Sequence, residues 1–268
     1  MERVLSSLAP ARRRLVLLVT VLAVAAVAAV VVAVLAGREE PAKPVSQDRA
    51  GPVVLVPGYG GSTTGLDQLA TTLRARGKDA TVFHLPGGGR GDLDAQAAAL
   101  GRAVDDVLAR SKAQSVDVVG YSAGGVVARL WLRGHGGAAK ARRVVTLGSP
   151  HHGTDVALLA GSTLPGACPA ACRQLAPGSD VLAGLNAGDE TPSGPSVVSI
   201  WTTRDDVVLP PDSAALSGAL NLTVQSVCPS DTVRHGGLPT DPRVQAIVLA
   251  VLAPGNPVRP SACRAVST

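Results

Sequence analysis

The sequence predicts a protein of the α/β class, with a mostly parallel sheet of about six strands, helices on both faces of the sheet and a transmembrane helix before it. Short apolar runs alternate with helical patterns, and strands that are apolar throughout are typical of parallel sheets covered on both sides. An unbroken apolar stretch near the N-terminus is long enough to cross a bilayer. With 46% hydrophobic and 17% charged residues, the chain is too apolar to be intrinsically disordered.

The apolar stretch covers residues 15–36, about 33 Å as a helix, and Thr20 is its only polar member. The positive-inside rule predicts a cytoplasmic basic tail at 1–14, with the rest of the protein outside the cytoplasm. A cleaved signal peptide is the alternative, although the apolar regions of signal peptides are usually shorter. In that case the protein is secreted instead of held in the cell membrane. A polar linker at 37–51 then leads to a folded domain at 52–268.

The charge and the cysteines limit the classes of partner. Of the net charge of +5, the first fourteen residues carry +3, so the folded part lacks the basic surplus of a nucleic-acid-binding domain. All four cysteines follow the apolar stretch, and an even number in an exported domain favours disulfides. Of three possible connectivities we favour Cys168–Cys172 with Cys228–Cys263. No histidine lies at zinc-finger spacing from them, so we expect no metal site.

Apolar runs and helical periodicity locate the elements of the folded domain. Strands are predicted at 52–56, 80–85, 115–119, 143–147, 196–202 and 222–227. A helix follows the first strand, with Thr64 as its expected N-cap, and the longest helix begins near Asp92. Further helices are predicted at 126–132 and from Pro242. In such a sheet the reactive groups lie at the carboxyl ends of the strands.

A sharp turn with a serine at its centre follows the third predicted strand. The run Gly120–Gly125 reads G-Y-S-A-G-G, and a helix follows it. Glycines beside a serine at a strained strand–helix turn avoid collisions, and the turn exposes the hydroxyl at the sheet edge. A plain glycine-rich turn is the alternative, but the strand before and the helix after favour Ser122 as a nucleophile.

A serine nucleophile needs a base, and the chain has five histidines. In this type of site the chain order is nucleophile, acid, base, and only His235 follows both the serine and the fifth strand. It lies in a loop between the sixth strand and the last helix. His84 could line the floor of a pocket, and His135 is expected to be a solvated helix end. His151 and His152 are expected to be structural or at the pocket rim.

The acid that orients the base should follow the fifth strand. Asp205 comes first after the strand end and is the predicted acid, and Asp206 is the alternative. Asp212 and Asp231 lie farther from the strand end.

Two backbone amides are expected to form an oxyanion hole. One is the amide of Ala123, just after the nucleophile, and the other is that of Tyr59, in the glycine-rich loop after the first strand. A phosphate-binding loop is the competing interpretation of residues 57–62. These residues lack the Lys-Ser/Thr of a P-loop and the G-x-G-x-x-G spacing, which argues against it.

Several dispersed motifs together resemble the α/β-hydrolase superfamily and, within it, the small bacterial secreted lipases and esterases. The similarity covers about residues 52–253 and rests on Val54–Gly61, Gly120–Gly125, Thr146–Thr154, Ser199–Asp205 and His235-Gly236. Pro57 departs from the family pattern, which commonly has His there. The resemblance implies a minimal α/β-hydrolase fold in which Ser122 attacks an ester carbonyl, His235 takes its proton and Asp205 orients the imidazole. It implies an acyl-enzyme that water hydrolyses, with no metal or cofactor.

The substrate is less well defined by the sequence, beyond a lipid or a small ester. Residues 150–195 could form a lid or a pocket wall, in which Leu158, Leu159 and Leu164 either contact an acyl chain or pack on the sheet. Two other functions fit the same residues. One is a thioesterase or acyltransferase with the same triad, and the other is a catalytically silent hydrolase fold that serves as a tethered binding protein.

Overall fold

The computed structural model describes residues 10–36, 45–163 and 165–266. The chain divides into two compact units, Met1–Ala42 and Lys43–Thr268. The predicted tail at 1–9, part of the predicted linker at 37–44, and Leu164 lie outside the described residues.

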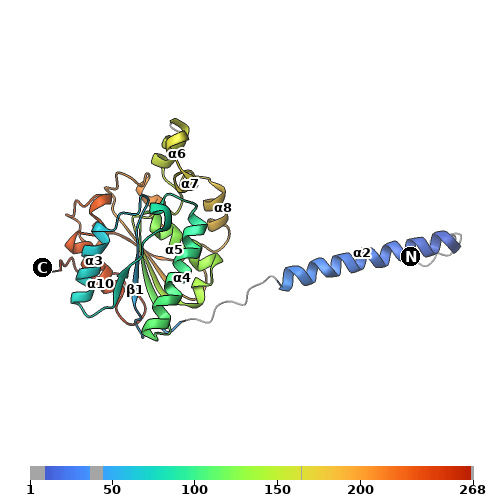
Figure 1. Ribbon diagram of the computed structural model, residues 1–268, viewed down its shortest axis with the longest axis horizontal. Helices are drawn as coiled ribbons and strands as arrows, with labels where there is room; N and C mark the ends of the chain where they lie inside the picture. The colour runs from blue at the N-terminus through green and yellow to red at the C-terminus, as the bar shows by residue number, and fades with distance from the viewer. Residues whose placement is uncertain (1–9, 37–44, 164, 267–268) are drawn as a thin grey trace. The chain divides into compact units, whose positions relative to one another are not determined.

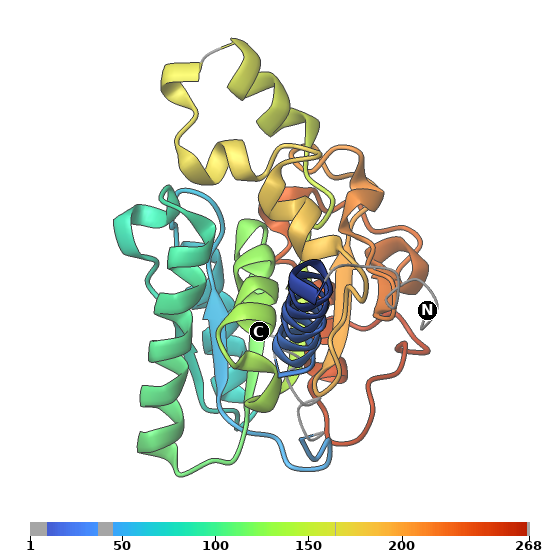
Figure 2. The same cartoon turned by 90° about the vertical axis from the view of Figure 1, so that its right-hand side faces the viewer.

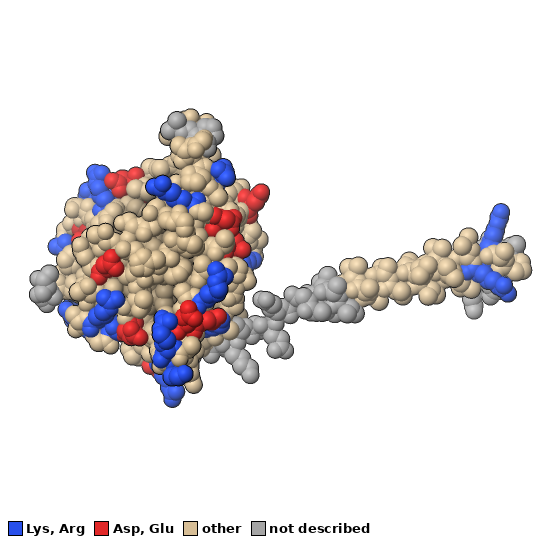
Figure 3. Space-filling view, in the orientation of Figure 1, with Lys and Arg blue, Asp and Glu red and all other residues tan. Residues whose placement is uncertain are grey.

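The described residues of the first unit form an apolar helix, α2 (Pro10–Ala36). Pro10 is its first residue, a position where proline's fixed φ and missing N–H are well tolerated. Residues Pro10–Val30 are long and apolar enough to cross a membrane, as predicted for this part of the chain. Among the described side chains, Figure 3 shows charge at only one end of the helix, where the arginines lie.

The second unit is built on a six-stranded sheet, and all of its paired strands are parallel, as predicted. The strands are β1 (Val53–Val56), β2 (Ala80–Val82), β3 (Val116–Tyr121), β4 (Ala141–Leu147), β5 (Ser196–Trp201) and β6 (Leu220–Thr223). Their order in space is β2-β1-β3-β4-β5-β6. The direction of strand addition reverses between β1 and β3, so their carboxyl ends frame the crevice where α/β sheets bind ligands.

Helices cover both faces of the sheet (Figure 1). The long helices are α3 (Thr64–Ala75), α4 (Leu93–Ser111), α5 (Ala123–Gly134) and α10 (Pro242–Val251). The sheet has one hydrophobic core on each face, and alternate residues of one strand pack into the two cores. Val54 and Val56 of β1 pack with α4 and α5, whereas Val53 and Leu55 pack with α3 and α10. This explains why the strands read as continuous apolar runs.

Shorter elements connect these layers. They are η1 (Pro86–Gly89), η2 (Gly137–Ala139), α6 (Asp155–Thr163), η3 (Pro165–Ala167), α7 (Ala170–Gln174), α8 (Asp180–Asn186), η4 (Pro211–Ala214), α9 (Val224–Val227) and η5 (His235–Gly237). Figure 2 shows α6 and α7, in yellow tones, beyond one end of the strands.

Some element boundaries differ from the prediction. The residue that caps α3 is Thr63 rather than Thr64, and it makes no side-chain cap hydrogen bond. Strand β6 ends at Thr223, because the Thr223 hydroxyl accepts from the Ser226 amide and starts α9 where the strand was expected to continue. The predicted start of α4 is confirmed, since the Asp92 carboxylate accepts from the Ala95 amide at 2.8 Å.

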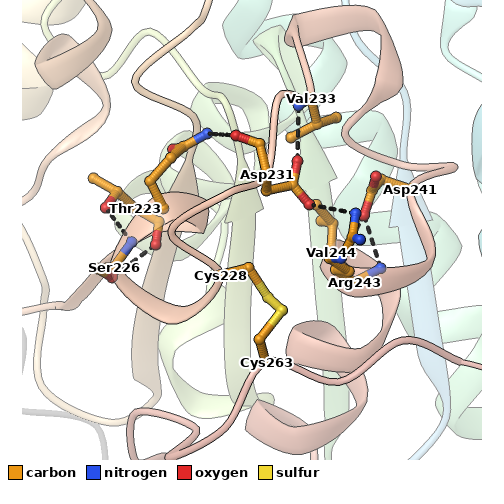
Figure 4. Close-up of a disulfide and its surroundings, with 10 residues drawn as sticks. Thr223, Ser226, Cys228, Asp231, Val233, Asp241, Arg243, Val244 and Cys263 are labelled. Atoms are coloured by element: carbon orange, nitrogen blue, oxygen red, sulfur yellow. Dashed lines mark hydrogen bonds and ion pairs between the residues drawn. A yellow bond between two sulfur atoms is a disulfide. The ribbon is translucent and has the colours of Figure 1, made fainter.

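Both predicted disulfides are present. The Cα atoms of Cys168 and Cys172 are 5.2 Å apart, and those of Cys228 and Cys263 are 4.8 Å apart. The second bond joins the segment after β6 to the C-terminal tail (Figure 4). Beside it, Asp231 accepts from the Val233 amide at 2.7 Å, which holds the loop that leads to η5.

At the amino ends of β3 and β4, buried charges tie the tail to the sheet. The Arg142 guanidinium donates to both oxygens of Asp117, and neither side chain is exposed. Arg142 and Arg143 also donate to backbone carbonyls just after α10, among them that of Ala253. Arg142 further binds the carbonyl of Gln47. The two arginines also donate to the carbonyls of Val251 and Leu252, which satisfies helix-terminal carbonyls that have no partner within α10.

Candidate active site

The turn after β3 has a strained backbone at Ser122. This residue has φ 53° and ψ −128°, a region that side chains with a Cβ rarely occupy. A Cβ at Gly120 would lie 2.6 Å from Gly125, and one at Gly124 would collide with the Val56 carbonyl. Glycine at these two positions lets the strand, the turn and α5 approach closely, which leaves the serine at the tip of the turn.

The structure brings the three predicted triad residues together. The Nε2 atom of His235 lies 3.1 Å from the Ser122 hydroxyl, and its Nδ1 lies 2.9 Å from Oδ2 of Asp205. The residues follow β3, β5 and β6, so the geometry joins the carboxyl ends of separate strands. A serine, an imidazole and a carboxylate in this order can form and stabilise an activated nucleophile.

Asp205 is held in place on its other side. Its Oδ1 accepts from the amides of Val207 and Val208 at 2.9 and 2.8 Å, and its side chain is only 1% exposed. Both carboxylate oxygens are therefore occupied, one by the backbone and one by the imidazole. This fixes the plane of the carboxylate and with it the orientation of His235.

The other acid candidates have different partners. Asp206 pairs with Arg234 at 3.1 Å on the surface, and this hydrogen bond lowers the pKa of Asp206. Asp231 is buried against Val233 and Arg243, and Asp212 lies exposed in η4. Among them, only Asp205 hydrogen-bonds to the imidazole of His235 within the described residues.

Two neighbours of the His–Asp pair were not expected from the sequence. The Tyr121 hydroxyl donates to the His235 carbonyl at 3.2 Å, and the two rings lie 5.2 Å apart. Burial, together with Asp205 and Asp206, raises the pKa of Tyr121 to about 12, so the hydroxyl stays protonated as a donor. Gly148, at φ +55°, lies so close that a Cβ would approach His235 Nδ1 to 3.2 Å. The sequence feature that could have identified Gly148 is its position directly after a buried strand.

The remaining histidines lie apart from this chain of hydrogen bonds. His84 is exposed and does not line the cleft described below, contrary to the suggested pocket floor. His135 ends α5 and pairs with Asp94 at 2.8 Å rather than being only solvated. His152 pairs with Glu190, and His151 is fully buried against Thr146 at 3.1 Å. Burial keeps the pKa of His151 well below its usual value.

The two expected oxyanion donors lie near the serine. Ala123 is the first residue of α5, so its amide has no acceptor within the helix. In the part of the chain that the structure describes, the Tyr59 amide also has no hydrogen-bond acceptor. The loop after β1 touches the nucleophile, because a Cβ at Gly58 would lie 2.8 Å from the Ser122 Cβ.

An apolar cleft of about 320 Å³ opens beside the serine. Its lining residues are Tyr59, Ser122, Pro150, Thr154, Val156, Ala157, Ala160, Ala167, Cys172, Leu175, Val207 and Val208. Leu158 and Leu159, expected either to contact an acyl chain or to pack on the sheet, do neither, because they lie exposed on the other side of α6. Segment 150–195 therefore contributes to the wall through other residues of α6 and through Cys172 and Leu175.

No cluster of three or more metal-ligating side chains occurs within the described ranges. A larger hollow of about 470 Å³ lies between α10 and the C-terminal tail, and no triad residue lines it. The cleft beside Ser122 is therefore the candidate site, since it alone combines apolar walls with the strained serine.

A family model described as the alpha/beta hydrolase fold matches residues 51–167, which include β1, β3 and the turn at Ser122. The chain has the α/β-hydrolase fold. Solved structures with this likeness include lipase B of Aspergillus fumigatus, with a TM-score of 0.66 and 20% identity over 82% of this chain. This chain spans 56% of the length of that lipase. Among curated proteins, no sequence relative matches the chain.

Two further solved structures are similar. A Bacillus licheniformis lipase in its mature form has a TM-score of 0.56 and 20% identity, covering 68% of this chain and 85% of its own. A metagenomic carboxyl esterase has a TM-score of 0.51 and 20% identity, covering 69% of this chain and 65% of its own. At such identities the likeness concerns the fold.

Proposed function

We propose that the protein hydrolyses carboxylic esters through Ser122, His235 and Asp205. The observation that carries the proposal is the unbroken hydrogen-bond chain from the buried Asp205 through His235 to Ser122, which ends at an apolar cleft. A silent binding protein would have no physical need for a strained serine that is hydrogen-bonded to a held imidazole. The lipases and the esterase with similar folds agree with this reaction class.

The geometry supports a two-step mechanism. His235 takes the Ser122 proton as the hydroxyl oxygen attacks the ester carbonyl, and the tetrahedral oxyanion accepts hydrogen bonds from the amides of Ala123 and Tyr59. Each such donor is typically worth about 3 kcal/mol of transition-state stabilisation. His235 then gives the proton to the leaving alcohol, and the acyl group stays on the serine. Water attacks the acyl-enzyme by the same proton transfers and releases the acid.

We also propose that catalysis takes place outside the cytoplasm. The apolar α2 acts as a membrane anchor after a basic tail at 1–14, or as a signal peptide that is removed. Two disulfides support an oxidising compartment. Residues 37–51 then link the anchor to a hydrolase domain at 52–268, and the membrane contact is made through α2.

The test is hydrolysis of p-nitrophenyl acyl esters by the full chain in detergent, beside Ser122→Ala. We expect turnover that vanishes in the variant while its thermal unfolding stays unchanged. Adding competing alcohols and thiols to the assay and analysing the products distinguishes hydrolysis from acyl transfer. Well-folded protein without turnover towards any ester or acceptor would favour the silent binding protein instead.

A further inference from the structure

Helix α6 has apolar side chains on two faces with different surroundings. Val156, Ala157 and Ala160 line the cleft, as expected for residues spaced i, i+1 and i+4 on one helix face. Leu158 and Leu159 point away from the cleft and are 51% and 63% exposed. The helix therefore forms one wall of the cleft with its smaller side chains.

The cleft offers few polar groups to a bound chain. Among its described lining residues none is charged, and only Tyr59, Ser122 and Thr154 carry a hydroxyl. The Thr154 hydroxyl is already occupied, because it donates to the Val207 carbonyl at 2.7 Å and accepts from the Leu209 amide at 3.0 Å. An uncharged aliphatic chain can fill such a space without leaving a polar group unpaired.

Three alanines line the cleft, and their small side chains do not narrow it. They differ in whether a larger side chain could replace them without disturbing the fold. Ala157 is buried and packs in the hydrophobic core, and Ala167 is exposed at the rim. Ala160 is half-buried between them. A larger side chain at 160 would extend into the cleft without displacing the core.

We propose that Ala160 is a specificity-determining residue and that the preferred substrates are esters of aliphatic acids of up to about ten carbons. This rests on the ester hydrolysis proposed above. The chain length follows from the volume. A methylene group takes about the space of a water molecule in the liquid, about 30 Å³, so a cleft of about 320 Å³ that also holds the ester group at Ser122 sets an upper limit of about ten carbons. Longer chains extend beyond the wall into solvent.

The proposal predicts a chain-length profile. In the full chain, kcat/KM for p-nitrophenyl esters should rise with acyl length by up to about fourfold for each methylene that is buried, and level off near ten carbons. In Ala160→Phe the optimum should move to acyl chains about four carbons shorter, because cores and clefts are filled at nearly constant density. The loss of turnover in Ala160→Phe should grow with acyl length, because the added ring takes up space that only the longer chains fill.

The control is Leu159→Phe, which introduces the same side chain on the adjacent, outward face of α6 and should keep the wild-type profile. An unshifted optimum in Ala160→Phe, or an equal loss at every chain length, would overturn the specificity assignment while leaving ester hydrolysis intact. Absence of ester turnover in the wild-type protein would remove the proposed function itself. If Ala160→Phe does not fold by circular dichroism, Ala160→Val and Ala160→Leu should give smaller graded shifts, and a flat series would contradict the proposal.

Discussion

The carboxyl ends and the amino ends of the strands form two edges of the sheet, here called the carboxyl edge and the amino edge. Both contain buried polar groups, but these groups have different partners. At the carboxyl edge, hydrogen bonds run from the amides of Val207 and Val208 through Asp205 and His235 to Ser122, which opens on a cleft. At the amino edge, the donors of the buried arginines go to Asp117 and to carbonyls of the chain ends. The first network ends at solvent-accessible space and the second closes on the protein.

Burial of a charge therefore does not by itself indicate a catalytic role. A carboxylate at either edge must be paired, because an unpaired buried charge is costly. Asp117 is paired with a cation and contributes to the attachment of the tail, whereas Asp205 is paired with an imidazole whose other nitrogen faces the Ser122 hydroxyl. Substitutions at the two edges should therefore separate activity from stability.

The largest expected effect is on activity at the carboxyl edge. Asp205→Asn should lower kcat by about 10⁴-fold, because the amide would favour the wrong imidazole tautomer, while thermal unfolding changes little. The neighbouring Asp206→Asn is the matched control and should change kcat by no more than a few-fold, since its carboxylate is on the surface and pairs with Arg234. The opposite ranking in steady-state kinetics would assign the acid to Asp206.

The next effect is on stability at the amino edge. Asp117→Ala should lower the free energy of unfolding by about 3–5 kcal/mol, because it leaves the Arg142 guanidinium buried without its counter-charge. Ester turnover by the folded fraction should stay near the wild-type level. Urea unfolding monitored by circular dichroism measures the first quantity, and a loss of activity in fully folded protein would contradict the separation of the two edges.

The two disulfides should also differ in whether their loss affects stability alone or activity as well. Replacing both Cys228 and Cys263 by Ser should cost about 4 kcal/mol, and replacing Cys168 and Cys172 about 2 kcal/mol, because the first pair closes the longer loop. Only the second replacement should alter turnover of long acyl esters, since Cys172 lines the cleft. Thermal unfolding and the acyl-length profile of both double variants test this. Equal effects on the profile would show that the cleft wall does not depend on the local bond.

The smallest expected effect is a pH dependence of stability from His151. Its pKa is lowered in the folded state by burial, so below pH 6.5 the unfolded chain binds a proton that the folded protein does not. The contribution of His151 to the free energy of unfolding is fully present above pH 6.5. Below pH 6.5 the free energy of unfolding should fall by up to about 1.4 kcal/mol per pH unit. His151→Gln should remove this slope in urea titrations at pH 5.5 and 6.5, and His84→Gln, at an exposed site, is the control. A slope that persists in His151→Gln would assign it to other groups.

The sequence predicted the sheet and the chain order of the triad residues because these depend on local signals. Apolar runs mark strands buried on both faces, and the glycines around Ser122 mark a tight turn. The end of β6 was missed, since it depends on the bond between the Thr223 hydroxyl and the Ser226 amide. The N-cap of α3 was placed one residue late, at Thr64 instead of Thr63, where no side-chain cap bond marks the boundary. The pairing of Arg142 with Asp117 was missed as well, because side chains 25 residues apart carry no periodic signal.

The amino-acid sequence was enough to predict the α/β class, an apolar N-terminal segment and the small set of residues from which a nucleophile, a base and an acid could come. These follow from residue type and spacing along the chain. The three-dimensional structure was needed to show which carboxylate contacts His235, which face of α6 lines the cleft and how Tyr121 and Gly148 lie against the His–Asp pair. Such choices depend on distances of a few ångströms between segments far apart in the chain, which packing sets and local sequence does not encode.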